Sequence, residues 1–140
     1  MFARAALPSR TLETFQLDVL GRAPSTSLLL SGVADAILVN AQFLRGDAAQ
    51  LAHTIAASGK RLTTIHISAA EPQAYFGLGV PQQAFPQADI LASGTRVAHW
   101  GGILKHNAPR CIVLPQPYEG DCLQLEGRHI ALRQLEAAFN

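Results

Sequence analysis

The amino-acid sequence predicts an α/β fold in which helices cover one face of a mixed sheet. A strand, a helix and a strand follow one another between Ala36 and Ser68, and this βαβ unit should make a right-handed crossover between parallel strands. Two apolar runs, Ser27–Ser31 and Ala36–Asn40, are separated by Gly32-Val-Ala-Asp35, which is typical of an antiparallel hairpin. Because one pairing is parallel and the other antiparallel, the sheet is expected to be mixed.

The chain before this hairpin predicts one further strand. Apolar and polar residues alternate over Thr11–Leu20 closely enough for a strand. Gly21–Ser25 is a cluster of turn residues. We therefore expect the sheet to begin with an antiparallel meander.

Asp47–Ser58 is the clearest helix in the sequence. Its apolar residues recur at helical spacing and form one stripe, and Gly59 stands where a helix C-terminal cap belongs. His53 falls off that stripe, so we interpret it as a solvated helix residue rather than a ligand. The helix should pack its apolar stripe against the sheet.

The second half of the sequence predicts short elements separated by proline and glycine. Two helices are expected there before the C-terminus, at Val80–Phe85 and Thr95–His106. The expected strands are Asp89–Ala92, Arg110–Leu114, Cys122–Leu125 and His129–Leu132. Leu132–Phe139 is expected to form a closing helical turn or two.

Composition bounds the class of protein. At 140 residues and 15.0 kDa, residues 1–140 are expected to form one domain. Hydrophobic residues make up 49% and charged residues 15%, which indicates some surface that another molecule covers. A net charge of +1 predicts no binding to nucleic acid. With no leader pattern in Met1–Arg10 and no long apolar run, no membrane segment is expected and the cytoplasm is the default location.

Cys111 and Cys122 are the only cysteines of the chain. They flank a hairpin-like segment, so a disulfide between them is conceivable. Two isolated thiols are more often buried and reduced, and we favour that interpretation.

The stretch that carries a resemblance follows the second strand of the βαβ unit, Leu62–Ser68. It reads Ser68-Ala69-Ala70-Glu71-Pro72-Gln73-Ala74-Tyr75-Phe76-Gly77. Aligned on its Ser, Pro and Gly, it resembles the metallo-β-lactamase superfamily, whose signature is Thr/Ser-His-x-His-x-Asp-His-x-x-Gly. The resemblance implies half of an αβ/βα sandwich.

The metal-binding positions of that signature are changed. Ala69 and Ala74 stand where the family has histidine ligands, and Gln73 replaces an aspartate ligand. Glu71 occupies the place of the second histidine, where the flavodiiron branch uses glutamate. Asn40 ends a strand that in the family usually ends in aspartate. Open catalytic metal sites take about three protein ligands, so we expect no metal, with Glu71 the only surviving candidate ligand.

Other candidate residues have simpler interpretations. His66 is expected to be a half-buried strand residue, although it could be a remnant ligand beside Glu71. His99 and His106 lie two helical turns apart, too far to share a metal. His129 is interpreted as an edge-strand residue, and Tyr75, Phe76 and Trp100 are interpreted as core residues.

The resemblance covers residues 12–131 but only the first half of the family's fold, and the family's other ligands lie in its second half. One sheet face, about 400 Å² in projection, should then lack a cover. Burying it is worth on the order of 10 kcal/mol before the cost of association. We therefore expect a homodimer in which two copies replace the two halves, with a partner protein or edge-to-edge pairing as alternatives.

The leading functional hypothesis is a non-catalytic, metal-free structural or binding module of this fold, with its small-molecule ligand unknown. The alternative is an enzyme that binds zinc or iron. It would be a metal-dependent hydrolase or flavodiiron-like oxidoreductase whose site around Glu71 is completed across a dimer, with His66 or His99 contributing. A third interpretation is an engineered or evolved fragment of a metal-dependent hydrolase.

Overall fold

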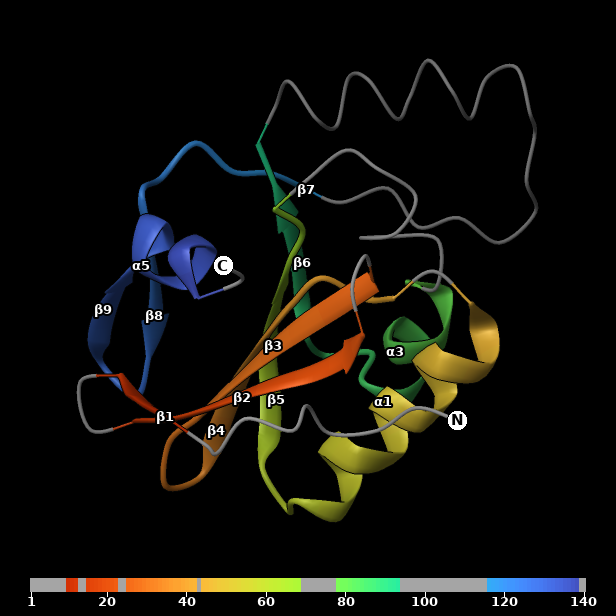
Figure 1. The fold of residues 1–140 in the computed structure, drawn as a ribbon. Coiled ribbons are helices and arrows are strands. Elements are labelled where there is room, and N and C mark those ends of the chain that lie inside the picture. The colour runs from red at the N-terminus through yellow and green to blue at the C-terminus, as the bar shows by residue number, and fades with distance from the viewer. Residues whose placement is uncertain are drawn as a thin grey trace.

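A computed structural model describes residues 10–12, 15–22, 25–42, 44–68, 78–93 and 116–138. Its centre is a seven-stranded sheet with the strands in chain order, β1 to β7 (Figure 1). The strands are β1 Arg10–Leu12, β2 Phe15–Arg22, β3 Ser25–Ser31, β4 Asp35–Val39, β5 Arg61–His66, β6 Asp89–Ala92 and β7 Gln116–Pro117. Pairing is antiparallel from β1 to β4 and parallel from β4 to β7, which confirms the mixed sheet.

Two strand predictions were wrong. The single strand expected over Thr11–Leu20 is two strands, β1 and β2, which pair antiparallel with Arg10 opposite Leu17. Alternation alone does not reveal a chain reversal inside a run of β-forming residues. Gln116–Pro117, expected to be a connection, forms β7 and pairs with β6. Proline is tolerated there because β7 is the edge strand of the sheet.

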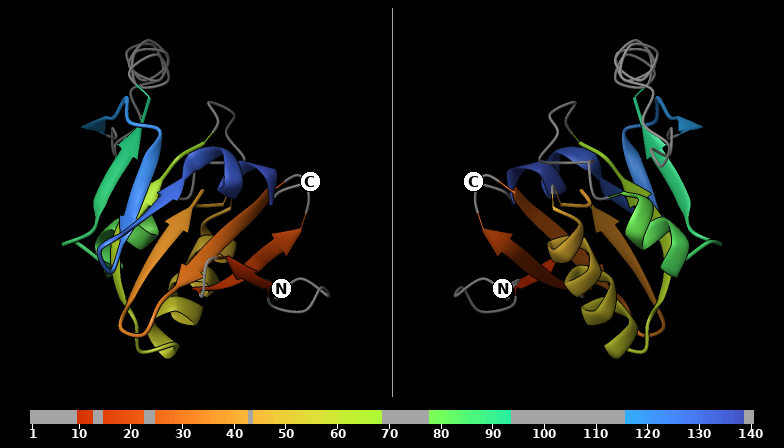
Figure 2. Two further views of the ribbon diagram at one scale, coloured as in Figure 1. Left: turned by 90° about the vertical axis from the view of Figure 1, so that its left-hand side faces the viewer. Right: turned by 90° about the vertical axis from the view of Figure 1, so that its right-hand side faces the viewer.

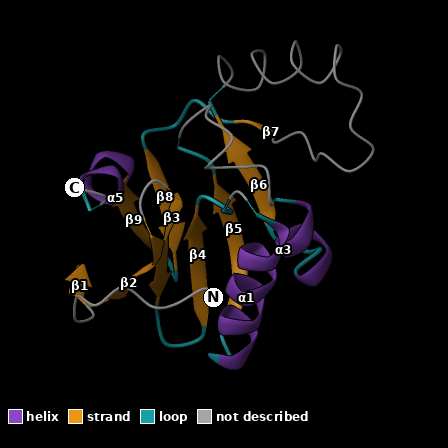
Figure 3. Ribbon diagram, turned by 45° about the vertical axis from the view of Figure 1, so that its right-hand side comes forward, coloured by secondary structure: helices purple, strands orange, loops and turns teal. Residues whose placement is uncertain are grey.

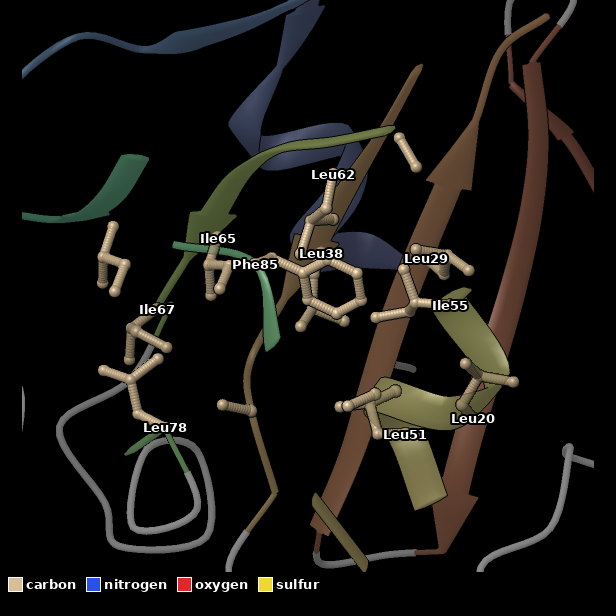
Figure 4. Packing of buried hydrophobic residues seen from close by; sticks show 14 of the residues in the cluster. Leu20, Leu29, Leu38, Leu51, Ile55, Leu62, Ile65, Ile67, Leu78 and Phe85 are labelled. Carbon is tan, nitrogen blue, oxygen red and sulfur yellow. The ribbon is translucent and has the colours of Figure 1, made fainter. Parts of the chain in front are cut away.

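Helices α1, Arg45–Ala57, and α3, Gly79–Ala84, cover one face of the sheet (Figure 3). Four residues of the α1 stripe are buried as expected, Ala48, Leu51, Ala52 and Ile55, whereas Ala56 is exposed. Gly59 follows the last turn at φ +74° and His53 is exposed, both as expected. Figure 4 shows the core between these helices and the sheet. The members labelled there are Leu20, Leu29, Leu38, Leu51, Ile55, Leu62, Ile65, Ile67, Leu78 and Phe85.

A second layer covers the opposite face, which we call the inner face. Strands β8, Cys122–Leu125, and β9, Arg128–Ala131, form an antiparallel hairpin, and helix α5, Leu132–Ala137, follows it (Figures 1 and 2). The second core cluster comprises Phe15, Leu17, Leu28, Leu30, Ile37, Val39, Leu123, Leu125, Ile130 and Leu135. The expectation of a bare inner face was therefore wrong over β2–β4, where the chain's own hairpin packs.

Strand β5 carries a β-bulge that the sequence pattern did not predict. The pairing with β4 shifts between Ala36 and Ile37, so that Leu62 pairs with Ala36 and Thr64 with Ile37. The extra residue is Thr63, and the alternation of sides is broken there. Plain alternation along the strand would place Thr63 on the same side as Ile65, and the bulge overturns that expectation. Both threonines instead line a cleft on the inner face.

Glu126, in the turn between β8 and β9, fixes the hairpin to the sheet. Its carboxylate accepts hydrogen bonds from the backbone N–H groups of Val33, Ala34 and Asp35, at 2.9, 2.7 and 3.1 Å. A Cβ at position 32 would clash with this carboxylate, so a larger residue there would have to displace the Glu126 side chain from its backbone donors. The bonds from Ala34 and Val33, more than any other cause, lower the pKa of Glu126 below 4.5.

Glu126→Gln is expected to destabilise the protein at neutral pH. A carboxylate whose folded pKa is lowered adds stability above its unfolded pKa and loses it as pH falls through the folded pKa. The urea midpoint of the variant should therefore be lower than that of the parent at pH 7, and the gap should narrow below pH 4.5. Glu136→Gln on the exposed side of α5 is the control. A gap that is absent, or the same at every pH, would contradict this role.

Three sequence predictions about the C-terminal half are confirmed. β6 and β8 have the predicted bounds, Asp89–Ala92 and Cys122–Leu125, and α5 lies within the predicted Leu132–Phe139. The predicted strand His129–Leu132 is β9, Arg128–Ala131, which begins and ends one residue earlier. Cys122 is a free thiol. The predicted helix Thr95–His106, the predicted strand Arg110–Leu114 and Cys111 lie outside the described residues. Among the described helices, none has the length and apolar character needed to cross a membrane.

Candidate functional site

A cluster of uncharged polar side chains lies where β4 and β5 end. Asn40 directly follows β4, and Ser68 comes two residues after β5. The Asn40 Nδ2 group donates to Ser68 Oγ at 2.9 Å, and the Ser68 N–H donates to Asn40 Oδ1 at 2.8 Å. Asn40 N–H continues the parallel ladder by donating to the His66 carbonyl at 2.9 Å. Asn40 therefore clamps the residue from which the chain leaves the sheet.

A second tier of side chains supports Asn40 from β3. Ser27 Oγ donates to the Asn40 carbonyl at 2.7 Å and accepts from Gln42 Nε2 at 2.9 Å. Gln42 Oε1 in turn accepts from Ser25 Oγ at 3.1 Å. Asn40, Ser27 and Gln42 are all buried. A connected set of buried hydrogen bonds of this kind holds its members in one arrangement.

The backbone is constrained at two of these positions. Asn40 has φ +67° and Gln42 has φ +78°. Asparagine is enriched in this left-handed region because its short side chain bonds locally, whereas glutamine has no such preference. The network supplies the compensation at Gln42, since both ends of its amide are hydrogen-bonded.

Of three comparisons with known proteins, only the one with solved structures finds matches, and these concern the fold. No protein-family model matches the sequence, and no curated protein matches it. Solved structures do match. A metallo-β-lactamase from Cronobacter sakazakii, described by a HARLDQ motif, aligns with TM-score 0.62 and 24% identity over 79% of this chain and 46% of its own.

The chain has about half of a metallo-β-lactamase fold. A metallo-β-lactamase from Pontibacter korlensis aligns with TM-score 0.62 and 9% identity, over 92% of this chain and 58% of its own. A mutant flavo di-iron protein from Thermotoga maritima aligns with TM-score 0.61 and 13% identity, over 92% of this chain and 36% of its own. These identities establish the fold alone. The chain spans about half the length of the lactamases and less of the flavo di-iron protein.

Of the metal-site positions expected from the metallo-β-lactamase signature, the structure places one. Asn40 lies at the end of β4, as predicted, and is 7% exposed. The other four lie outside the described residues, and they are Ala69, Glu71, Gln73 and Ala74. The same holds for Tyr75, Phe76, His99, Trp100 and His106.

His66 and His129 lie on different strands and in different surroundings. His66 is 2% exposed, more deeply buried than the half-buried residue expected, and it pairs in register with Val39 and Leu91. It lies on the opposite side of β5 from Ile65 and Ile67, which belong to the core under α1 and α3. His129 is exposed on β9.

The described part of the network does not fit a zinc or iron centre. Its side chains are amides and hydroxyls, whereas these metals take imidazole, thiolate and carboxylate ligands. Oδ1 of Asn40 is already used by the Ser68 N–H, and Nδ2 is a donor. Across the described residues, no three His, Cys, Asp or Glu side chains gather closely enough to hold a metal ion.

Asparagine suits a buried position whose described hydrogen-bond partners are all uncharged. An aspartate at position 40 would place a negative charge at a 7% exposed site among neutral hydroxyl and amide groups. Burying an unpaired carboxylate is costly, whereas an amide of the same shape supplies both a donor and an acceptor. The residue type at position 40 is thus matched to neutral surroundings.

Sequence reasoning missed the supporting residues. It singled out Asn40 through the resemblance, but not Ser27, Gln42 or Glu126. Serine and glutamine in or after a strand carry no distinctive pattern. Glu126-Gly127 does read as a turn, yet nothing in it indicates which backbone groups the carboxylate binds some 90 residues away.

Proposed function

We propose that the chain is a non-catalytic, metal-free half of a metallo-β-lactamase-like fold and acts as a structural or binding module. The observation that carries the proposal is the neutral clamp between Asn40 and Ser68 at the ends of β4 and β5. The carboxyl ends of parallel strands are where α/β folds place their chemistry. Here the described polar atoms bind one another.

The replaced signature residues support the same proposal from the sequence side. Ala69 and Ala74 lack the metal-binding nitrogen of histidine, and Gln73 and Asn40 lack the negative charge of aspartate. One carboxylate, Glu71, does not make a catalytic metal site. The module would therefore act through its surfaces.

Restoring the three signature residues should create metal affinity that the parent lacks. The combined substitutions Ala69→His, Gln73→Asp and Ala74→His are expected to raise the affinity for zinc or iron at least about tenfold. Losing a residue that only hydrogen-bonds to a metal ligand already lowers metal affinity by about that factor, so restoring three ligands should gain at least as much. Isothermal titration with zinc measures this. Ala84→His, Ala137→His and Gln50→Asp, at exposed positions on three separate helices, are the control with the same residue types.

Two results would count against the proposal. Parent protein that binds zinc or iron as tightly as the restored variant, and turns over a hydrolase or oxidoreductase substrate, would establish the enzyme alternative around Glu71. Restored protein with no gain over the scattered control would mean that the loop does not follow the signature's geometry.

The homodimer stays a prediction, but the surface available for it differs from the one expected from the sequence. The inner face over β2–β4 is already packed against the hairpin and α5, so a second copy lying face to face there would have to displace them. The part of the inner face nearer β5 and β6 is the part that has room for a partner. Sedimentation equilibrium of the purified chain tests the dimer directly.

A further inference from the structure

An open cleft of about 470 Å³ runs along β8 on the side away from β9. Its wall is Leu123 and Gln124 of β8 with the turn at Gly127, and its floor comes from β5 and β6. The floor residues are Thr63, Thr64, Asp89 and Leu91, with Asp35, Glu126 and Tyr118 at its ends. Within the described residues β8 and β9 form a two-stranded sheet, so the cleft lies where a third strand of that layer would lie.

The register of the hairpin shows which backbone groups point into the cleft. Antiparallel pairs alternate between those that bond each other and those whose N–H and C=O point outward. Leu125 and Arg128 flank a two-residue turn and bond each other, and so do Leu123 and Ile130. The pair Gln124 and His129 therefore points outward, Gln124 into the cleft and His129 to the far edge.

The cleft has an acidic end and an apolar end. Glu126 bonds the start of β4, and Tyr118 joins the end of β6 to the start of β8 through its N–H to Ala92 and its hydroxyl to Cys122. β8 therefore runs opposite to β4 and β6. Its last residues lie near Asp89, and its first residues lie near Leu91 and Tyr118.

Charge sets the direction in which an occupant would lie. At the acidic end, Asp35 is salt-bridged to Arg61 at 3.2 Å and Glu126 binds backbone N–H groups. Asp89 is exposed and forms no ion pair with any described residue. A basic residue over Asp89 and an apolar residue two positions later, over Leu91, match the floor at strand spacing.

We propose that the edge of β8 away from β9, with which no described strand pairs, accepts an extended strand from another polypeptide. The strand pairs antiparallel with β8, places a Lys or Arg near its N-terminal end over Asp89, and covers Leu91 with an apolar side chain. This deepens the proposed function, on which it rests, by assigning the surface through which the module binds. Backbone hydrogen bonds supply affinity in such strand addition, and the alternate side chains supply specificity.

A second copy's β8 does not fit this edge. Two antiparallel strands that pair about a twofold axis place their sheets' equivalent faces on the same side. Each β8 lies over its own seven-stranded sheet, so β5 and β6 of the two copies would occupy the same space. The occupant must therefore be a strand without a layer beneath it.

The experiment uses two synthetic peptides, acetyl-Lys-Thr-Val-Thr-Val-amide and its reversed sequence acetyl-Val-Thr-Val-Thr-Lys-amide. Titration into the full chain, followed by amide NMR, should show tighter binding of the first. The Gln124 amide should become protected from hydrogen exchange, while the His129 amide at the opposite edge should not. Asp89→Lys should weaken binding of the first peptide about tenfold, as expected for one charge-assisted contact.

Gln124→Pro and His129→Pro form a matched pair, because each removes one outward N–H from the same register position. Gln124→Pro should weaken binding about tenfold through the lost backbone bond and the altered edge, and His129→Pro should leave it unchanged. If Gln124→Pro fails to fold, peptides N-methylated at successive positions test the same edge on the parent. At least one methylated position should abolish binding.

Three outcomes would overturn the inference: no binding of the first peptide at millimolar concentration, equal affinity for both peptides, or protection of His129 instead of Gln124. Competition between the peptide and a self-associated form of the chain would make a second copy the occupant and would also overturn it. Metal content is measured on the same samples. Metal-loaded, active protein that still binds the peptide refutes the proposed function alone, and metal-free protein that binds no peptide refutes this inference alone.

Discussion

Ile130→Ala is expected to lower the free energy of unfolding by about 2–5 kcal/mol, because it opens a cavity between two packed layers. Ile130 is fully buried on β9, and it pairs in register with Leu123 of β8. Its side chain belongs to the cluster that joins the hairpin to β2–β4. Urea denaturation followed by circular dichroism gives the change.

The neighbouring residue on the same strand is the matched control. His129 is exposed, so His129→Ala should change the free energy of unfolding by no more than about 0.5 kcal/mol. Equal, small effects of the two substitutions would mean that the hairpin does not pack on the inner face. That face would then be open, as the sequence alone suggested, and the basis for a face-to-face dimer would return.

Asn40→Ala is expected to cost about 2–4 kcal/mol of stability, from two sources. The substitution removes both side-chain hydrogen bonds to Ser68. It also places at φ +67° an alanine, which cannot form the local hydrogen bonds that let asparagine tolerate this conformation. Asn40→Gly removes the same bonds but tolerates that φ. We therefore expect it to cost about 1 kcal/mol less than Asn40→Ala.

The order of these two variants separates the clamp from the backbone effect. A glycine variant as stable as the parent would mean that only φ matters at position 40 and that the bonds to Ser68 contribute nothing. An alanine variant as stable as the parent would remove both arguments. Hydrogen exchange of the Ser68 amide should also be faster in each variant, since its acceptor is lost.

The parts of the fold that the sequence predicted are those encoded locally. Helix α1 was recognised from its own apolar stripe and the Gly59 that follows it. Strand β6 was recognised from the short apolar run Asp89–Ala92. The parallel pairing of β4 and β5 follows from the handedness of a βαβ unit. Such features need no information from distant residues.

The parts that failed depend on contacts between distant segments. The two strands of the hairpin were predicted as separate short elements, but their place on the inner face is fixed by Glu126 and by Leu123 and Ile130 packing on β2–β4. The bulge at Thr63 moves one residue across the strand without any change of residue type. At the candidate site, Asn40 was found through a resemblance, whereas Gln42 was visible only once its hydrogen bonds were known.

The measurement that tests the account most directly is the zinc and iron content per chain, after exposure to both metals and separation by size. The neutral clamp at Asn40 and the replaced signature residues predict essentially no metal in any separated species, together with no hydrolytic turnover. Close to one metal per chain or per dimer, lost along with activity on chelation, would contradict the account and make Glu71 the first residue to replace.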